Sequence, residues 1–188
     1  WSSDVCSSDL EIQDKLIVPK NRLNELTKGS LTLGSLIVEP FSVSHDAADP
    51  IGINVFAGNN KATIVTDTGV ISDNILRRID DTTLLVLEAN YDPHMLRFGP
   101  YQSFLKQRVA SDEGHLSNEM AAQALLMMKR PDFMQVILAH RSENNNNAVL
   151  VTQTIGKMLV DGGVRIGPEM KLQHGQPNEI VSIQSVER

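Results

Sequence analysis

Three residues with metal-binding side chains each stand directly after an apolar stretch of this 188-residue chain. They are His45 after residues 41–44, Asp67 after residues 62–66 and His140 after residues 136–139. In α/β proteins, functional groups collect at the ends of strands. Imidazole and carboxylate groups bind zinc and similar ions, and one carboxylate can bridge two ions. The pattern therefore predicts a metal site, although Asp67 is equally compatible with a turn-capping aspartate before Thr68 and Gly69.

Two further residues are candidates for chemistry beside that site. His115 follows Gly114 and precedes a helix start expected at Ser117, which places it on a loop suited to an anion such as phosphate. Glu88 ends an apolar stretch and can hold an imidazole in one tautomer. The alternatives are an exposed loop histidine and a surface acid. The remaining histidines, His94 and His174, lie in polar surroundings and are expected to face solvent.

The apolar pattern predicts a sheet covered by helices, an α/β (α+β) fold. Alternation and turn residues predict hairpins over residues 31–38 and 53–66, and strands over 41–44, 82–87, 136–139 and 180–186. Capping residues predict helices over 21–27, 73–79, 101–109, 117–130 and 147–159. Residues 91–100 are expected to be irregular, and the asparagine run 144–147 is expected to be a loop that ends in a helix cap.

Composition limits the classes of function. The formal charge of −6 disfavours unspecific coating of nucleic acid. Aromatic residues are scarce, so the sequence shows no evident platform on which bases of a single-stranded nucleic acid could stack. Apolar runs of about 18 residues, which a membrane-spanning helix needs, do not occur. Cys6 is the single cysteine, so no disulfide can form within the chain, and a reducing, cytoplasmic location is expected.

Residues 1–10 repeat Ser-Ser-Asp without the period of a helix or strand. The codons of a sequencing adaptor translate into the same tripeptide followed by leucine, so we interpret this segment as non-native; the alternative is a genuine polar tail. On this interpretation, residues 11–188 form the C-terminal part of one domain, and the natural N-terminal part is expected to be missing.

Five segments together resemble the metallo-β-lactamase-fold hydrolases, and more narrowly the YycJ/WalJ exonuclease branch, which is related to RNase Z and RNase J. The segments are residues 41–50, 66–69, 87–92, 114–118 and 138–142. The resemblance implies an αβ/βα sandwich of two sheets with helices outside and a two-metal site at one sheet edge. The family's main signature, His-x-His-x-Asp-His, does not occur in this sequence, so the four metal-ligand positions that it contains are missing as well.

The resemblance also implies a role for each candidate residue. His45 would bind one metal, Asp67 would bridge two divalent ions such as zinc or manganese, and His140 would bind the second ion. His115 would bind the scissile phosphate or protonate the leaving oxygen, with Glu88 as a weaker match to an acid that orients it. Because so many ligands are missing, the fragment itself is expected to be a poor or inactive enzyme.

The implied activity is metal-dependent cleavage of a phosphodiester, with DNA as the expected partner. The implied mechanism is attack by a hydroxide that two metal ions activate. Arg97, Lys106 and Arg108 are candidates for contacts with phosphates at the rim, although charged helix faces are usually only solvated. Two alternatives stay open: a hydrolase of another ester, a thioester or a lactam on the same fold, and a non-catalytic binding module that has lost its metals.

Overall fold

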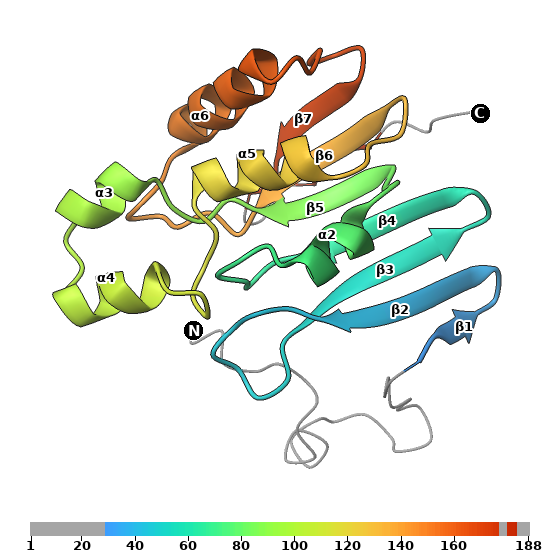
Figure 1. Ribbon diagram of the computed structural model, residues 1–188, viewed down its shortest axis with the longest axis horizontal. Helices are drawn as coiled ribbons and strands as arrows, with labels where there is room; N and C mark the ends of the chain where they lie inside the picture. The colour runs from blue at the N-terminus through green and yellow to red at the C-terminus, as the bar shows by residue number, and fades with distance from the viewer. Residues whose placement is uncertain (1–28, 177–179, 184–188) are drawn as a thin grey trace.

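The computed structural model describes residues 29–176 and 180–183, whose strands form one seven-stranded sheet in the order β1-β2-β3-β4-β5-β6-β7 (Figure 1). Strand order therefore follows chain order. The first three pairings are antiparallel and the last three are parallel. The change at β4 marks the passage from hairpins to strand–helix–strand units, as expected for a mixed α/β sheet.

Two hairpins build the antiparallel half, from β1 (Leu31–Leu33), β2 (Leu36–Ser42), β3 (Ile51–Ala57) and β4 (Asn60–Val65). Their turns contain Gly34 at φ 61° and Gly58 at φ 56°, backbone angles that glycine adopts without steric cost. Both predicted hairpins are confirmed. The strand expected at residues 41–44 is the end of β2, which stops at Ser42, three residues before His45.

The parallel half contains β5 (Leu84–Glu88), β6 (Met134–Ala139) and β7 (Met170–His174). Helix α2 (Asp73–Ile79) connects β4 to β5, helix α5 (Asn118–Met127) precedes β6, and helix α6 (Ala148–Asp161) connects β6 to β7. Strand β7 was not predicted, because its alternating residues include Lys171, Gln173 and His174 and give a weak apolar signal.

Helices α2, α5 and α6 lie over one face of the sheet (Figure 1). The core between them includes Ile75 and Ile79 from α2, Leu125 from α5 and Ile155 from α6, packed on strand residues such as Leu87. On the other face, the row of paired residues Ile53, Ile64, Val86 and Ile137 is only partly buried, and Ile64 is 41% exposed. The helix-covered face therefore holds the main core.

The predicted capping residues begin the helices that surround the core. Ser72, Ser117 and Asn147 each accept a hydrogen bond from the backbone N–H three residues later. These bonds satisfy N–H groups that a helix leaves unpaired at its start. Helix α5 ends at Met127, three residues before the predicted end at Arg130.

Residues 91–100 are not irregular, contrary to the prediction. Helix α3 (Pro93–Phe98) begins after Asp92, whose carboxylate accepts from Met95 N, with Pro93 in the first turn. This aspartate–proline start signal was present in the sequence. Helix α4 (Ser103–Val109) follows, within the predicted range 101–109. In Figure 1 the two helices lie together at one end of the molecule.

Some expectations concern the ends of the chain. The segment 1–10 and the helix expected over 21–27 lie outside the described residues. Of the edge strand expected over 180–186, residues 180–183 are described and are not in a strand; Ser182 O accepts from the side chain of Gln173 in β7, and Ile180 is 97% exposed. No helix in the described part of the chain has the length and apolar character needed to cross a membrane.

Candidate metal centre

The carboxyl ends of β4, β5 and β6 bring Asp67, Glu88 and His140 to one edge of the sheet. The three strands are parallel neighbours, so residues that follow or end them must lie close together. Asp67 and His140 have left-handed backbone angles, φ 56° and 51°. Such angles cost energy for residues other than glycine and cluster at functional sites.

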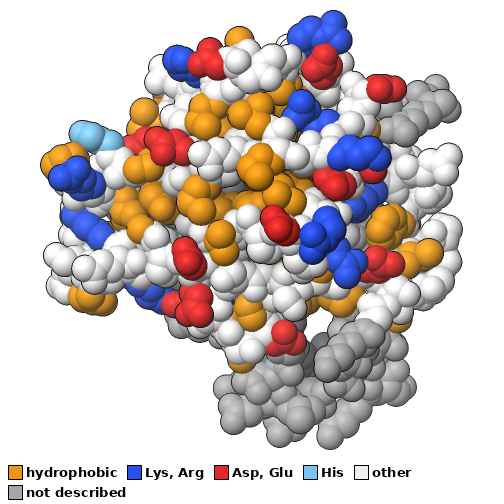
Figure 2. Space-filling view, viewed as in Figure 1, with side chains coloured by type: hydrophobic (Ala, Val, Ile, Leu, Met, Phe, Trp, Pro, Cys, Tyr) orange, Lys and Arg blue, Asp and Glu red, His pale blue; other side chains and the backbone are white. Residues whose placement is uncertain are grey.

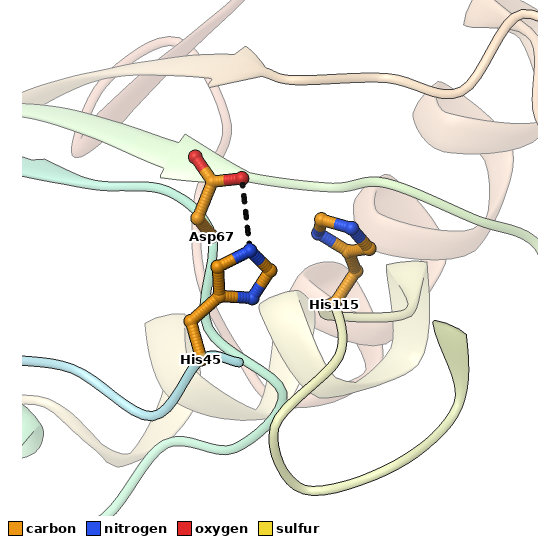
Figure 3. A group of neighbouring side chains, drawn as sticks. All are labelled: His45, Asp67 and His115. Atoms are coloured by element: carbon orange, nitrogen blue, oxygen red, sulfur yellow. Dashed lines mark ion pairs between the residues drawn. The ribbon is translucent and has the colours of Figure 1, made fainter. Parts of the chain in front are cut away.

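Asp67 stands between the two predicted histidine ligands. Its Oδ1 atom lies 3.7 Å from His45 Nε2 and 3.7 Å from His140 Nδ1. Figure 3 shows His45 and Asp67 directed toward each other, with His115 facing the same space. Asp67 Oδ1 is buried and has no hydrogen-bond partner. A buried carboxylate oxygen without a donor is costly unless a cation satisfies it, so this atom fits a metal ligand.

Glu88 joins the imidazoles of His115 and His140. Its side chain is fully buried, which excludes a surface acid, and its Oε1 lies 2.8 Å from His115 Nδ1 and 2.7 Å from His140 Nδ1. Its Oε2 accepts from the backbone N–H groups of Thr68 at 3.1 Å and Leu116 at 3.4 Å. Because each imidazole donates through Nδ1, its Nε2 atom is available to a metal ion or a substrate.

These contacts change the protonation of the buried acid and of one imidazole. Burial acts to raise the pKa of Glu88, but the hydrogen bonds and positive charges of His115 and His140 outweigh it, and the pKa is lowered. The hydrogen bond to Glu88 raises the pKa of His140, against the effect of burial. The pair therefore favours an ionised carboxylate beside a protonated imidazole when no metal is bound.

Two groups of donor atoms converge closely enough to share a cation. His45, Asp67 and His115 form one group, and Glu88, His115 and His140 form the other; within each, the candidate ligand atoms lie within 4.8 Å of one another. The imidazole rings of His45 and His140 lie 5.1 and 5.2 Å from that of His115, between centroids. The structure thus brings all five predicted site residues into one cluster.

Backbone contacts hold the loops that carry the cluster. His45 Nδ1 bonds to Gly114 O at 3.0 Å, which joins the His45 loop to the segment that carries His115. Thr68 Oγ1 donates to Val70 O and accepts from Ser44 N, so Thr68, rather than Asp67, provides the described side-chain bonds of that turn. The Asp67 carboxylate is therefore not needed to build the turn.

A set of buried amides fixes the loop after His140, and the sequence analysis missed it. Asn146 Nδ2 donates to the carbonyls of Ala89 and Asn90 and to Asn118 Oδ1, at 2.8 to 3.1 Å. Asn90 Nδ2 donates to His140 O at 2.8 Å. The asparagine run was predicted to be a plain loop, but two of its members are buried and join the ends of β5 and β6.

The cluster opens into a cavity of about 340 Å³. Helix α4 forms one wall through Leu105, Arg108 and Val109. Arg108 forms a two-bond ion pair with Asp46, and this pair is the first cause of the lowered pKa of Asp46. Arg141, a residue that the sequence analysis did not select, lines the cavity and has a buried guanidinium nitrogen without a partner.

The other two histidines lie apart from this cavity. His94 is exposed, as predicted, and its ring lies against that of Phe98 at a tilt of 47°, with centroids 4.6 Å apart. The prediction that His174 faces solvent is wrong. It lies at the end of β7, partly buried, with Nε2 bonded to Thr152 Oγ1, and burial lowers its pKa.

Comparison with known proteins places this geometry in a family. A family model described as the beta-lactamase superfamily domain matches residues 5–140. Exodeoxyribonuclease YycJ of Bacillus anthracis is 36% identical over 155 residues, which cover 82% of this chain and 59% of that protein. Exodeoxyribonuclease WalJ of Streptococcus pneumoniae is 33% identical over 147 residues, 78% of this chain and 55% of that protein. The chain thus spans little more than half the length of these relatives.

A solved structure supports the fold independently. The metallo-beta-lactamase fold protein YhfI from Bacillus subtilis superposes with a TM-score of 0.54 at 12% identity, over 79% of this chain and 50% of that one. At this identity the likeness concerns the fold alone.

Proposed function

This chain belongs to the beta-lactamase superfamily, and from that premise we propose that the whole protein is a metal-dependent nuclease that cleaves phosphodiester bonds of DNA. The observation that carries the proposal is the convergence of His45, Asp67 and His140 around one buried, unpaired carboxylate oxygen. The His115–Glu88 pair beside these residues favours a phosphodiester substrate. The relatives named as exodeoxyribonucleases favour DNA and attack at an end.

The donor set fits two divalent cations such as zinc or manganese. His45 would hold one ion, His140 the other, and Asp67 would serve both, since imidazole nitrogen and carboxylate oxygen are common ligands of these metals. When bound, the ions would supply a water of lowered pKa as nucleophile and neutralise charge on the phosphate. The unpaired Asp67 oxygen is the feature that such an ion would satisfy.

His115 is the residue that we assign to the leaving group. Its Nδ1 is held by Glu88, so its Nε2 can carry a proton toward the cavity and deliver it to the departing oxygen as general acid. Glu88 is a positioning residue in this scheme, because it fixes the rings of His115 and His140 from a buried place. Its hydrogen bond and negative charge also favour the protonated form of His140.

The 188-residue chain itself should bind metal weakly. It contains no His-x-His-x-Asp-His motif, so the described cluster offers only part of the ligand set that the family resemblance implies. We expect this chain alone to have little or no nuclease activity. We also propose that the protein works in the cytoplasm, a proposal that the lack of cysteine in residues 11–188 supports.

A nuclease assay on the whole protein tests the proposal. The protein encoded by the full reading frame that contains this chain is purified. It is then incubated with Mn²⁺ or Zn²⁺ and end-labelled DNA, with and without a chelator. We expect chelator-sensitive release of nucleotides, and loss of that release in the Asp67→Ala variant. Cleavage of a thioester or lactam substrate in place of DNA, or DNA cleavage that survives both the chelator and the substitution, would overturn it.

A further inference from the structure

Residues 93–109 differ in charge and composition from the rest of the molecule. This segment, here named the α3–α4 arm, contains Arg97, Lys106 and Arg108 and no aspartate or glutamate, in a chain whose formal charge is −6. It also carries the aromatic residues Phe98 and Phe104. A local basic surface is what an acidic protein needs to bind a polyanion, because the net charge of the whole would otherwise repel it.

The two phenylalanine rings project into solvent. Phe98 and Phe104 are each 67% exposed, whereas the arm is anchored through other residues. The anchoring cluster consists of Tyr91, Leu96, Val109, Tyr101 and Leu105. The anchoring cluster does not include the two rings, and the described ring contacts of Phe98 are with His94 and Arg97 of the same arm, so most of each ring's surface remains open to solvent. Exposed aromatic faces among basic side chains are the usual platform on which single-stranded nucleic acid stacks its bases.

Basic groups accompany the rings on the same arm. The guanidinium carbon of Arg97 lies 5.3 Å from the centroid of Phe98, and Lys106 Nζ donates to Arg97 O at 2.9 Å, which ties the two helices together. Arg108 is held by Asp46 and therefore contributes less free charge. Figure 2 shows hydrophobic and basic side chains next to each other over the end of the molecule where α3 and α4 lie.

The arm is continuous with the candidate metal centre. Tyr101, Leu105 and Arg108 line the same cavity as His115 and His140. A strand bound along α4 would therefore lie beside the cavity into which the metal cluster opens. Duplex DNA offers no exposed base faces for two separated rings, so the arrangement favours an unpaired strand.

We propose that the α3–α4 arm is a guide for single-stranded nucleic acid, with bases stacked on Phe98 and Phe104 and phosphates held by Arg97 and Lys106. The inference deepens the proposed nuclease function and rests on it for the identity of the ligand. On this proposal, the arm binds an unpaired end of the nucleic acid and directs it to the cavity. The sequence analysis named the basic residues of this surface as candidates for phosphate contacts, but it did not foresee the role of the rings, since it judged aromatic residues too scarce for stacking.

A binding assay in a chelator tests the guide separately from catalysis. Fluorescence anisotropy follows a labelled oligothymidylate and a matched duplex with the 188-residue chain in EDTA. Phe98→Ala and Phe104→Ala are each expected to weaken single-strand binding by roughly fivefold or more, since a stacked base contributes about that much. Phe104→Tyr, which keeps an aromatic face, should bind as the unsubstituted chain does. Met127→Ala, at an equally exposed site on α5, is the control and should have no effect.

The salt dependence tests the charge part of the proposal. Arg97→Gln is expected to reduce the slope of log affinity against log salt by about 0.7, the value for one phosphate contact on a single strand. Lys157→Gln on α6 makes the same change of charge outside the arm and should leave the slope unchanged. Unchanged melting temperatures would show that the variants are folded, as expected for exposed positions.

The outcomes separate this inference from the proposed function. Absence of single-strand binding, binding of the duplex as tight as that of the single strand, or equal binding by a variant that lacks both rings would overturn the guide. A change in oligomeric state on removal of the rings would assign them to a protein contact and overturn it as well. Ring-dependent binding combined with no nuclease activity in the whole protein would support the guide and refute the nuclease.

Discussion

Replacement of Glu88 by glutamine changes one oxygen to NH₂ and removes a buried charge without changing the size of the side chain. The two carboxylate oxygens together accept from four donors: His115 and His140 through Nδ1, and the backbone N–H groups of Thr68 and Leu116. In Glu88→Gln, the amide NH₂ must face either two ring donors or two backbone donors. Either two backbone donors then lose their partner, or both rings must give up the Nδ1 proton to accept from the amide.

The expected loss of stability is large because the acid is fully buried. Removal of one partner from a buried, hydrogen-bonded charge pair costs about 3 kcal/mol or more. For a chain of this length, a loss of about 3 kcal/mol corresponds to a fall in melting temperature of roughly 6–12 °C. Glu143→Gln makes the same chemical change at an exposed position beside the cavity, so it is the control and should cost less than about 0.5 kcal/mol.

The pH dependence of the loss follows from the two pKa shifts. The pKa of His140 is raised from its ordinary 6.5, so its contribution is complete below 6.5 and is lost as pH rises through the folded value. The pKa of Glu88 is lowered from its ordinary 4.5, so its contribution is complete above 4.5 and is lost as pH falls through the folded value. The gap between the chain and its Glu88→Gln variant should therefore be largest between pH 4.5 and 6.5.

Urea unfolding followed by circular dichroism, in EDTA and at several pH values from 5 to about 8, measures this gap. A variant as stable as the parent at every pH would refute the reasoning, because it would mean that Glu88 does not hold the imidazoles together. A loss of the expected size that does not decrease above pH 6.5 would contradict the assignment of the raised pKa to the His140–Glu88 bond.

Two further substitutions test the loops around the site. Asn146→Ala removes the amide that joins the ends of β5 and β6. It should lower the free energy of unfolding in urea by about 2–3 kcal/mol, because buried carbonyls lose their donor. Asn144→Ala, at an exposed position, is the control and should lower it by less than about 0.5 kcal/mol. Gly69→Ala would place a Cβ 2.3 Å from Ser111 O, so the turn after β4 must move. We expect a loss of stability of about 1–3 kcal/mol by thermal unfolding, together with weaker zinc binding. A variant with unchanged melting temperature and zinc affinity would contradict the close packing of these loops.

The clustering of the candidate site residues could be predicted from the sequence because it depends on a simple rule. Asp67, Glu88 and His140 follow or end strands that are parallel and adjacent, so the rule that parallel strands collect functional groups at their carboxyl ends was sufficient. His45 follows a strand of the antiparallel half and depends on a longer loop, which the structure fixes through Gly114 O. The strand-end pattern selected that residue as well, although β2 ends three residues before it.

The features that could not be predicted depend on contacts between distant residues. The buried state of Asn146 arises from partners 28 to 57 positions away, so a run of asparagines looked like an ordinary loop. Strand β7 is recognisable only through its pairing with β6, since its own residues are mostly polar or half-exposed. Helix α3 is a different case, because the Asp92–Pro93 start signal was present and was overlooked.

A zinc titration followed by NMR of the imidazole nitrogens tests the central claim most directly, since it reports each histidine separately. The claim is that His45 and His140 share a site around Asp67. Zinc is predicted to shift the signals of these two histidines together, and Asp67→Asn is predicted to weaken the apparent affinity by about tenfold or more. Shifts confined to His94 or His174, or equal affinity in the Asp67→Asn variant, would contradict the claim.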